Sequence, residues 1–223
     1  MLNSRTRPLI VATSALAFVV VAMAAEARHD SAEAIADRSG DGNPVAGKAK
    51  SEAGRCQSCH GVTGHGAAPE YPKLAGQYAD YILSQVRNFQ SGQRKHPVIQ
   101  ASSPAFSESD LADVAAYFAS QSSMTGGGQH AAESPVTSLY ARGDLKRDVL
   151  ACASCHGENG KSTFNGADSY PVIGGQQAAY VKAQLLSMRA GARKSGLGGV
   201  MNIVAKSLKD EEIEALSNYI AGM

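Results

Sequence analysis

The chain has almost no net charge. Its 21 lysines and arginines are balanced by 20 aspartates and glutamates, and no long run of like charges occurs. This balance gives no support for nucleic acid or an anionic membrane surface as a partner, because both are recognised by concentrated positive charge. The local acidic group at residues 210–214 is explained by the solvated face of a helix.

The sequence also lacks a long apolar run, apart from one near its start. This run extends from Leu9 to about Ala24, follows two arginines and is interrupted at residues 13–14. It is shorter than the roughly 18 to 20 residues that a membrane-spanning helix needs, and small residues follow it. We therefore predict a secretory signal peptide over residues 1–27, cleaved after Ala24 or Ala27, and an exported, periplasmic mature chain of about 196 residues.

Cysteine is scarce, and its placement is informative. All four cysteines lie in two Cys-x-x-Cys-His segments, CQSCH (Cys56 to His60) and CASCH (Cys152 to His156). An exported chain with an even number of cysteines favours disulfides, but a disulfide framework gives no reason for a histidine after each pair. Cys-x-x-Cys-His is the attachment sequence of haem c. The thiols add to the haem vinyl groups as thioethers, and the histidine lies under the iron as proximal ligand.

The sequence therefore predicts two covalently bound haem c groups. A thioredoxin-type redox site would be expected beside a strand–helix–strand unit, of which there is no sign. A zinc site would be short of ligands, because the two cysteine pairs lie far apart in separate modules. The residues expected to hold the haems are the attachment cysteines Cys56, Cys59, Cys152 and Cys155 and the proximal ligands His60 and His156.

The two haem segments belong to a duplicated module of about 80 residues. We predict one domain at residues 44–122 and a second at residues 139–223. A Gly- and Ser-rich linker at residues 123–138 joins them. The residues that match when the cysteine pairs are aligned are Gly47 with Gly143, Tyr71 and Pro72 with Tyr170 and Pro171, Gly76 and Gln77 with Gly175 and Gln176, Tyr81 with Tyr180, Gln85 with Gln184, and Tyr117 with Tyr219.

Both modules show helical periodicity. Apolar and half-polar positions recur on one helix face over residues 82–89 and 181–188, and more clearly over residues 111–118 and 213–220. No alternating stretch favours a sheet, so we expect an all-α fold of two tandem domains, each with a few helices around a haem. The covalently bound haem would supply the core that such small modules cannot build alone. The capping pairs expected before the last helices are Ser107 with Asp110 and Ser207 with Asp210.

The sixth iron ligand decides whether a haem only carries electrons or also meets small molecules. In the second module Met201, expected in the loop before the last helix, would give His/Met ligation; otherwise it is a core residue. The aligned position in the first module is Ile99, which cannot bind iron. Met124, at the edge of the linker, is a poor substitute, whereas His96 or its neighbour Lys95 could supply a nitrogen.

Three states of the first haem therefore stay open: ligation by His96, a five-coordinate or water-bound iron, and another ligand. We expect this haem to have a lower reduction potential than the second, or to be open to CO. The other histidines, His65 and His130, are assigned to a Gly-rich turn and to the linker.

Seven segments carry a resemblance to a known family: CASCHGENG, YPVIGGQQAAYVKAQL, MRAGAR and LKDEEIEALSNYIAGM in the second half, and CQSCHGVTGHG, YPKLAGQYADYILSQVRNFQSGQR and FSESDLADVAAYFASQ in the first. They resemble the cytochrome c4 family of di-haem periplasmic electron carriers. The resemblance covers both modules and implies two class I cytochrome c domains. These would pass single electrons from a quinol-oxidising complex or a dehydrogenase to a terminal oxidase, so any membrane association would go through such partners. It also implies the cysteine and histidine roles given above and a distal Met201, and it leads us to expect a methionine where Ile99 stands.

We expect an electron carrier and not an enzyme, because no general base, nucleophile or substrate-sized insertion is apparent. One alternative is a haem enzyme, a peroxidase or an oxidase of sulfur compounds such as thiosulfate, that uses an open or unusually ligated first haem. The other is a cytochrome subunit of a dehydrogenase complex, which would differ from the carrier only in its partner.

Overall fold

The computed structural model describes residues 40–127, 134–162, 170–194 and 196–223. The predicted signal peptide and His130 lie outside these residues. Within them the regular structure is helical, and the only bridge between extended residues joins Asp144 and Val149. None of the helices in these ranges is long and apolar enough to cross a membrane. The all-α prediction is confirmed.

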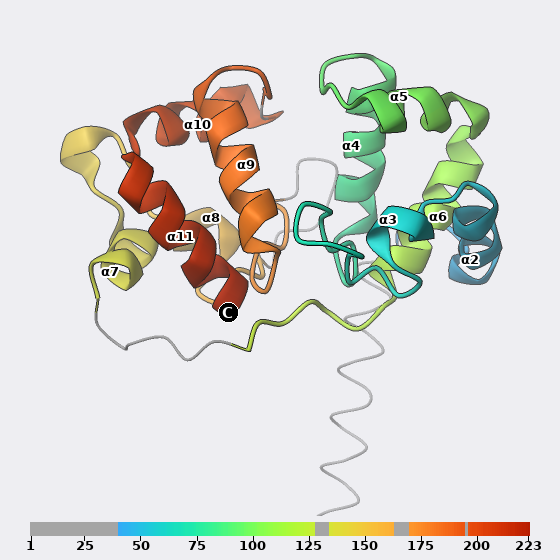
Figure 1. Cartoon of the computed structure of the whole chain (residues 1–223), viewed down its shortest axis with the longest axis horizontal. Coiled ribbons are helices and arrows are strands. Elements are labelled where there is room, and N and C mark those ends of the chain that lie inside the picture. Colours follow the sequence, from blue (N-terminus) through green and yellow to red (C-terminus); the bar gives the residue numbers. More distant parts are fainter. Residues whose placement is uncertain (1–39, 128–133, 163–169, 195) are drawn as a thin grey trace, which may run out of the picture. The chain divides into compact units, whose positions relative to one another are not determined.

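In the first module (module 1), α6 packs against α2 and α4 (Figure 1). Ile82, Val114 and Phe118 form the centre of its core, and Cys56 packs against the edge. The elements of module 1 are α2 (Pro44–Ala53), α3 (Gln57–His60), α4 (Ala79–Gln90), α5 (Pro97–Ser102), the 3-10 helix η1 (Ser103–Ala105) and α6 (Glu108–Ala119).

In the second module (module 2), α11 packs against α9 and α7, and α10 packs against α9. Its core surrounds Tyr140, Ile213 and Leu216, each about 1 % exposed. The elements of module 2 are α7 (Pro135–Arg142), the 3-10 helix η2 (Leu145–Arg147), α8 (Ala153–His156), α9 (Ala178–Arg189), α10 (Gly196–Ser207) and α11 (Asp210–Gly222).

The starts of the two last helices differ. Ser107 and Asp110 form the predicted capping box at α6, where the Ser107 amide donates to the Asp110 carboxylate at 3.1 Å. The prediction of Ser207 and Asp210 for α11 is wrong. Ser207 ends α10, and the residue before α11 is Lys209, whose amide donates to Glu212 at 2.9 Å. Glu212, three residues into α11, accepts from the residue before the helix, which is the role that the predicted pair gave to Asp210.

The segments before the last helices also differ between the modules. In module 2, α10 runs without interruption over Gly196–Ser207, so Met201 lies in a helix and not in the predicted loop. In module 1 the corresponding segment is a short α5 followed by a 3-10 helix that contains Pro104. Proline has no N–H for an α-helical hydrogen bond, which explains why α5 does not continue.

Both ends of the predicted linker are ordered. Ser134 caps α7 through Thr137, and Pro135 occupies the first turn, so residues 135–138 are helical. At the other end Met124 is 0 % exposed and packs with Tyr78 of module 1 and Val172 of module 2. The linker therefore begins as part of the contact between the modules.

A half-buried ion-pair group connects α2 to α6. Lys50 lies 2.7 Å from Asp110 and 2.5 Å from Asp113. Hydrogen bonds from Lys50, and then from Ser107, lower the pKa of Asp110 from 3.8 to about 2, and Lys50 also lowers the pKa of Asp113. Because the folded pKa values lie below the unfolded ones, this stabilisation is present above about pH 4 and is lost as the pH falls toward 2.

Replacing Lys50 with Gln should therefore reduce the loss of thermal stability between pH 4 and pH 2. The measurement is the unfolding midpoint of the haem-loaded protein against pH. Lys48→Gln is the matched control, because Lys48 is exposed on the same helix and forms no ion pair with another described residue. An equal acid loss in Lys50→Gln and the unmodified protein would contradict the expectation.

Candidate functional site

The two Cys-x-x-Cys-His segments have the same local structure. Each forms a four-residue helix, α3 or α8, that starts just after the first cysteine and ends on the histidine. Residues three apart lie on one face of a helical turn, so both sulfurs of a pair face the same way. The chain turns away at Gly61 and Gly157, whose φ angles of 77° and 78° favour glycine.

The thiols do not resemble those of a redox enzyme. None of the four forms a disulfide, all are half-buried, and burial raises the pKa of Cys56 and raises that of Cys152 to about 11. Reactive cysteines of disulfide exchange have lowered pKa values instead. No group of three or more His, Cys, Asp or Glu side chains within the described ranges could hold a metal ion, so the zinc alternative lacks a ligand set.

The two histidines are oriented for iron. His60 Nδ1 lies 3.0 Å from the carbonyl oxygen of Pro72, and His156 Nδ1 lies 3.0 Å from that of Pro171. A carbonyl can only accept, so each Nδ1 carries the hydrogen and Nε2 is left for the metal. Burial also lowers the pKa of both histidines, which favours the neutral form that binds metals. These carbonyls were not predicted, although the repeated Tyr-Pro pair marked their position.

In module 2, Met201 is the residue predicted as the sixth ligand. It is half-buried on α10 and packs against the same core as Cys152 of the attachment pair. Its neighbour Asn202 donates to the carbonyl oxygens of Met188 at 2.8 Å and Arg193 at 2.7 Å. These bonds fix the rotation of α10 at the position of Met201.

In module 1, His96 lies directly before α5. The His96 ring is exposed and meets the Phe89 ring edge to face, with centroids 6.3 Å apart. Phe89 is itself covered by Arg94, 4.6 Å from its centroid. Ile99 is half-buried on α5.

The structure also places the other candidates for a ligand of the first haem. Met124 is buried at the contact between the modules, where its sulfur accepts a hydrogen bond from Gln176 at 3.6 Å. Lys95 is exposed beside His96, and His65 is exposed in the predicted Gly-rich turn.

Two arginines, Arg94 and Arg193, lie at the contact between the modules, and their positive charge fits the acidic propionates of a haem. Arg193 is only 7 % exposed, and neither it nor Arg94 contacts a carboxylate of a described residue. Buried positive charge requires a counter-charge, which haem carries as propionates. Burial raises the pKa of Tyr180, but the arginines outweigh it, so this pKa is lowered. The bonds run from Arg94 to Gln85, Tyr180 and Gln184 (3.0, 2.8 and 2.9 Å) and from Arg193 to Gln184, Tyr81 and Gln85 (2.9, 2.9 and 3.2 Å).

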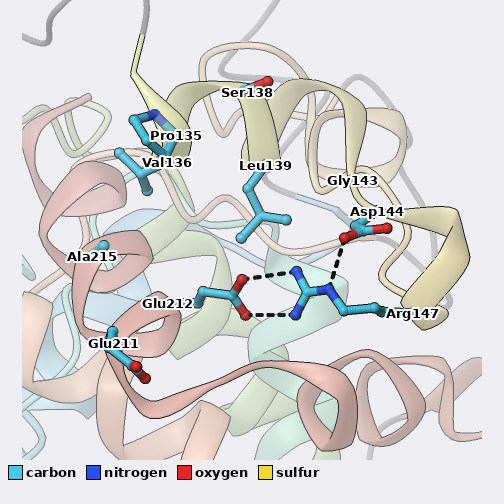
Figure 2. A pocket seen from close by; sticks show the side chains of 10 residues that line it. All are labelled: Pro135, Val136, Ser138, Leu139, Gly143, Asp144, Arg147, Glu211, Glu212 and Ala215. Atoms are coloured by element: carbon cyan, nitrogen blue, oxygen red, sulfur yellow. Dashed lines mark hydrogen bonds and ion pairs between the residues drawn. The ribbon is translucent and has the colours of Figure 1, made fainter.

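A separate groove of about 510 Å³ lies on module 2 between α7 and α11. Figure 2 shows Arg147 reaching across it to Glu212, with N–O distances of 2.8 and 3.1 Å, and to Asp144 at 2.7 Å. Neither a cysteine nor a histidine lines this groove, and its arginine is already paired. It therefore has no part in haem attachment.

Comparison with known proteins agrees with this geometry. The cytochrome c family model matches residues 44–122 and again residues 142–223. Cytochrome c4 of Azotobacter vinelandii is 38% identical over 192 residues, which cover 82% of this chain and 90% of that protein. The thiosulfate dehydrogenase electron acceptor of Stutzerimonas stutzeri (strain A1501) is 35% identical over 79% of this chain and 82% of its own length.

The crystal structure of reduced recombinant cytochrome c4 from Pseudomonas stutzeri superposes with a TM-score of 0.72 at 36% identity, over 82% of this chain and 99% of that one. The duplicated module, the two oriented histidines and these similarities lead to one assignment. The chain belongs to the cytochrome c4 family and is a di-haem electron-transfer cytochrome with haem c attached at Cys56 and Cys59 and at Cys152 and Cys155.

Proposed function

We propose that this periplasmic protein carries single electrons in one direction, from a donor at module 1 to an acceptor at module 2. Each bound haem supplies a one-electron couple, with His60 and His156 as proximal ligands. The observation that carries the proposal is the unequal pair of distal side chains. In module 1 the aligned position is Ile99 on α5, which cannot bind iron, and His96 lies directly before that helix. In module 2, Met201 packs on the same core as Cys152 of the attachment pair.

The two distal side chains set the direction of transfer. A methionine ligand raises the reduction potential of a haem relative to a nitrogen ligand. Ligation by His96 would therefore give module 1 the lower potential and Met201 would give module 2 the higher one. An electron received at module 1 then moves downhill to module 2.

A dehydrogenase is the proposed donor, because the relative from Stutzerimonas stutzeri is named as the electron acceptor of thiosulfate dehydrogenase. The test mixes the oxidised protein with such a dehydrogenase and thiosulfate and follows haem reduction by absorbance. Reduction should need both the dehydrogenase and thiosulfate. Reduction by thiosulfate alone would favour the enzyme alternative, and its absence in the complete mixture would exclude this donor.

The ligand proposal is tested by a potentiometric titration of the unmodified protein followed by electron paramagnetic resonance and near-infrared magnetic circular dichroism. We expect two separate waves, the lower with the signature of two histidines and the higher with that of histidine and methionine. Two equal histidine–methionine waves would overturn the role of His96.

A further inference from the structure

The two modules exchange a reciprocal hydrogen bond. In module 1, the peptide group between Pro72 and Lys73 has its oxygen 3.0 Å from His60 Nδ1. The N–H of the same peptide, on Lys73, donates at 2.7 Å to Oε1 of Gln176, a residue of module 2. One peptide group therefore lies between the histidine of one module and a glutamine of the other.

The arrangement is repeated in the opposite sense. The peptide between Pro171 and Val172 accepts from His156 Nδ1 at 3.0 Å, and its N–H donates at 2.9 Å to Oε1 of Gln77 in module 1. Both glutamines also use their amide nitrogens. Gln176 Nε2 donates to the Lys73 carbonyl at 3.0 Å and Gln77 Nε2 donates to the Val172 carbonyl at 2.8 Å.

These bonds lie away from water. Gln77 is 3 % exposed and Gln176 is 5 % exposed. Each follows a glycine in the left-handed region, Gly76 with φ 66° and Gly175 with φ 79°. A Cβ on Gly76 would come 2.5 Å from Ser123 and one on Gly175 would come 2.6 Å from Thr125. The glycine of each Gly-Gln pair therefore lets the start of the linker pack closely against the turn that carries the glutamine.

A chain of hydrogen bonds through a peptide is cooperative, especially where the surroundings are apolar. A glutamine that accepts from the peptide N–H draws charge toward the peptide oxygen and makes that oxygen a stronger acceptor. The bond from the histidine Nδ1–H then strengthens, and the imidazole becomes a more basic ligand. A more basic ligand stabilises ferric iron relative to ferrous iron and lowers the reduction potential.

We propose that Gln176 and Gln77 are positioning residues that tune the proximal histidine of the opposite module, Gln176 acting on His60 and Gln77 on His156. The reduction potential of each haem then depends on a residue of the other module and on the docking of the two. This inference uses the proximal histidines of the proposed function, but it does not depend on the distal ligand of either haem.

The test is the haem-loaded Gln176→Met variant, which keeps the volume of the side chain and removes both of its bonds to Lys73. We expect the potential of haem 1 to rise, with a change of about threefold in its reduced-to-oxidised ratio at fixed ambient potential, or about 30 mV for a one-electron couple. Haem 2, in the module that carries the substitution, should keep its potential. Gln77→Met should give the mirror result, a shift of haem 2 alone.

The two haems are assigned by nuclear magnetic resonance, through contacts of their shifted proton signals to Phe118 beside His60 and to Tyr170 beside His156. This assignment holds whatever the distal ligands are, so a failure of the His96 proposal and a failure of this one can be told apart. Tyr78→Phe is the matched control. It removes the hydrogen bond from the Tyr78 hydroxyl to the Ser162 carbonyl of module 2 and leaves both histidine-linked peptides intact.

Three outcomes would overturn the proposal: a shift of the haem in the substituted module, no shift in either haem, or the same shift in Tyr78→Phe. If the glutamine variants do not fold, hydrogen exchange in the unmodified protein decides the question. The Lys73 and Val172 amides should exchange slowly, and exchange at the rate of an exposed loop would count against it.

Discussion

Replacing His96 with Ala should turn haem 1 into a high-spin haem that binds CO, while haem 2 keeps its spectrum. The alanine has no nitrogen to offer, and Ile99 on the adjacent helix cannot bind iron. The choice of axial ligand changes haem reduction potentials within a range of about 0.8 V. We therefore expect the potential of haem 1, the lower wave, to change by about 0.1 V. The measurements are the absorbance of the reduced protein with and without CO and the potentiometric titration.

Two comparisons make this result specific to His96. His65→Ala removes an exposed histidine of the same module and should change neither haem. Lys95→Ala tests the neighbouring nitrogen. Adding Ile99→Met to His96→Ala should restore a six-coordinate haem with a raised potential, because it places a thioether at the position that aligns with Met201. If His96→Ala binds no CO and both waves stay in place, another side chain ligates haem 1.

Replacing Met201 with Leu should lower the potential of haem 2 and open it to CO. The substitution preserves volume, so the core that surrounds the side chain is retained, but the thioether is lost. A fall on the order of 0.1 V changes the ratio of reduced to oxidised haem 2 about fiftyfold at fixed ambient potential. Haem 2 would then no longer be the more easily reduced of the two, and transfer from module 1 to module 2 should slow.

Met188→Leu is the control for Met201→Leu. Met188 belongs to the same module and is 8 % exposed on α9, so the substitution has a similar packing cost without the loss of a proposed ligand. Potentiometric titration and stopped-flow reduction of both variants give the comparison. An unchanged upper wave in Met201→Leu would mean that Met201 is a packing residue.

Local patterns were sufficient to predict the four helices α4, α6, α9 and α11. The apolar stripes over residues 82–89 and 181–188 fall inside α4 and α9, and the stripes of the last helices fall inside α6 and α11. The haem segments were predicted as well, because the chemistry of thioether attachment needs both cysteines and the histidine close together in sequence. Errors arose where a local signal had a competitor, as when Glu212 took the capping role expected of the Ser207 pair.

The contacts between the modules could not be predicted in the same way. Gln77 and Gln176 are polar residues that local patterning would place on the surface. They are buried because each satisfies both hydrogen-bonding groups of one residue in the other module. Periodicity carries no information on such a long-range pairing. The repeat alignment matched Gln77 with Gln176 but did not indicate that each bonds to the other module.

The exchanged glutamines have the form of a two-fold homodimer interface, in which the same patch on each copy contacts its counterpart. In this chain the two copies are joined by residues 123–134, so their association is intramolecular and does not weaken on dilution. Covalent joining also frees the copies from being identical. A homodimer of one module would have the same residue at both aligned positions, whereas this chain has Ile99 in one and Met201 in the other. Under the proposed function, this difference lets one module receive the electron and the other pass it on.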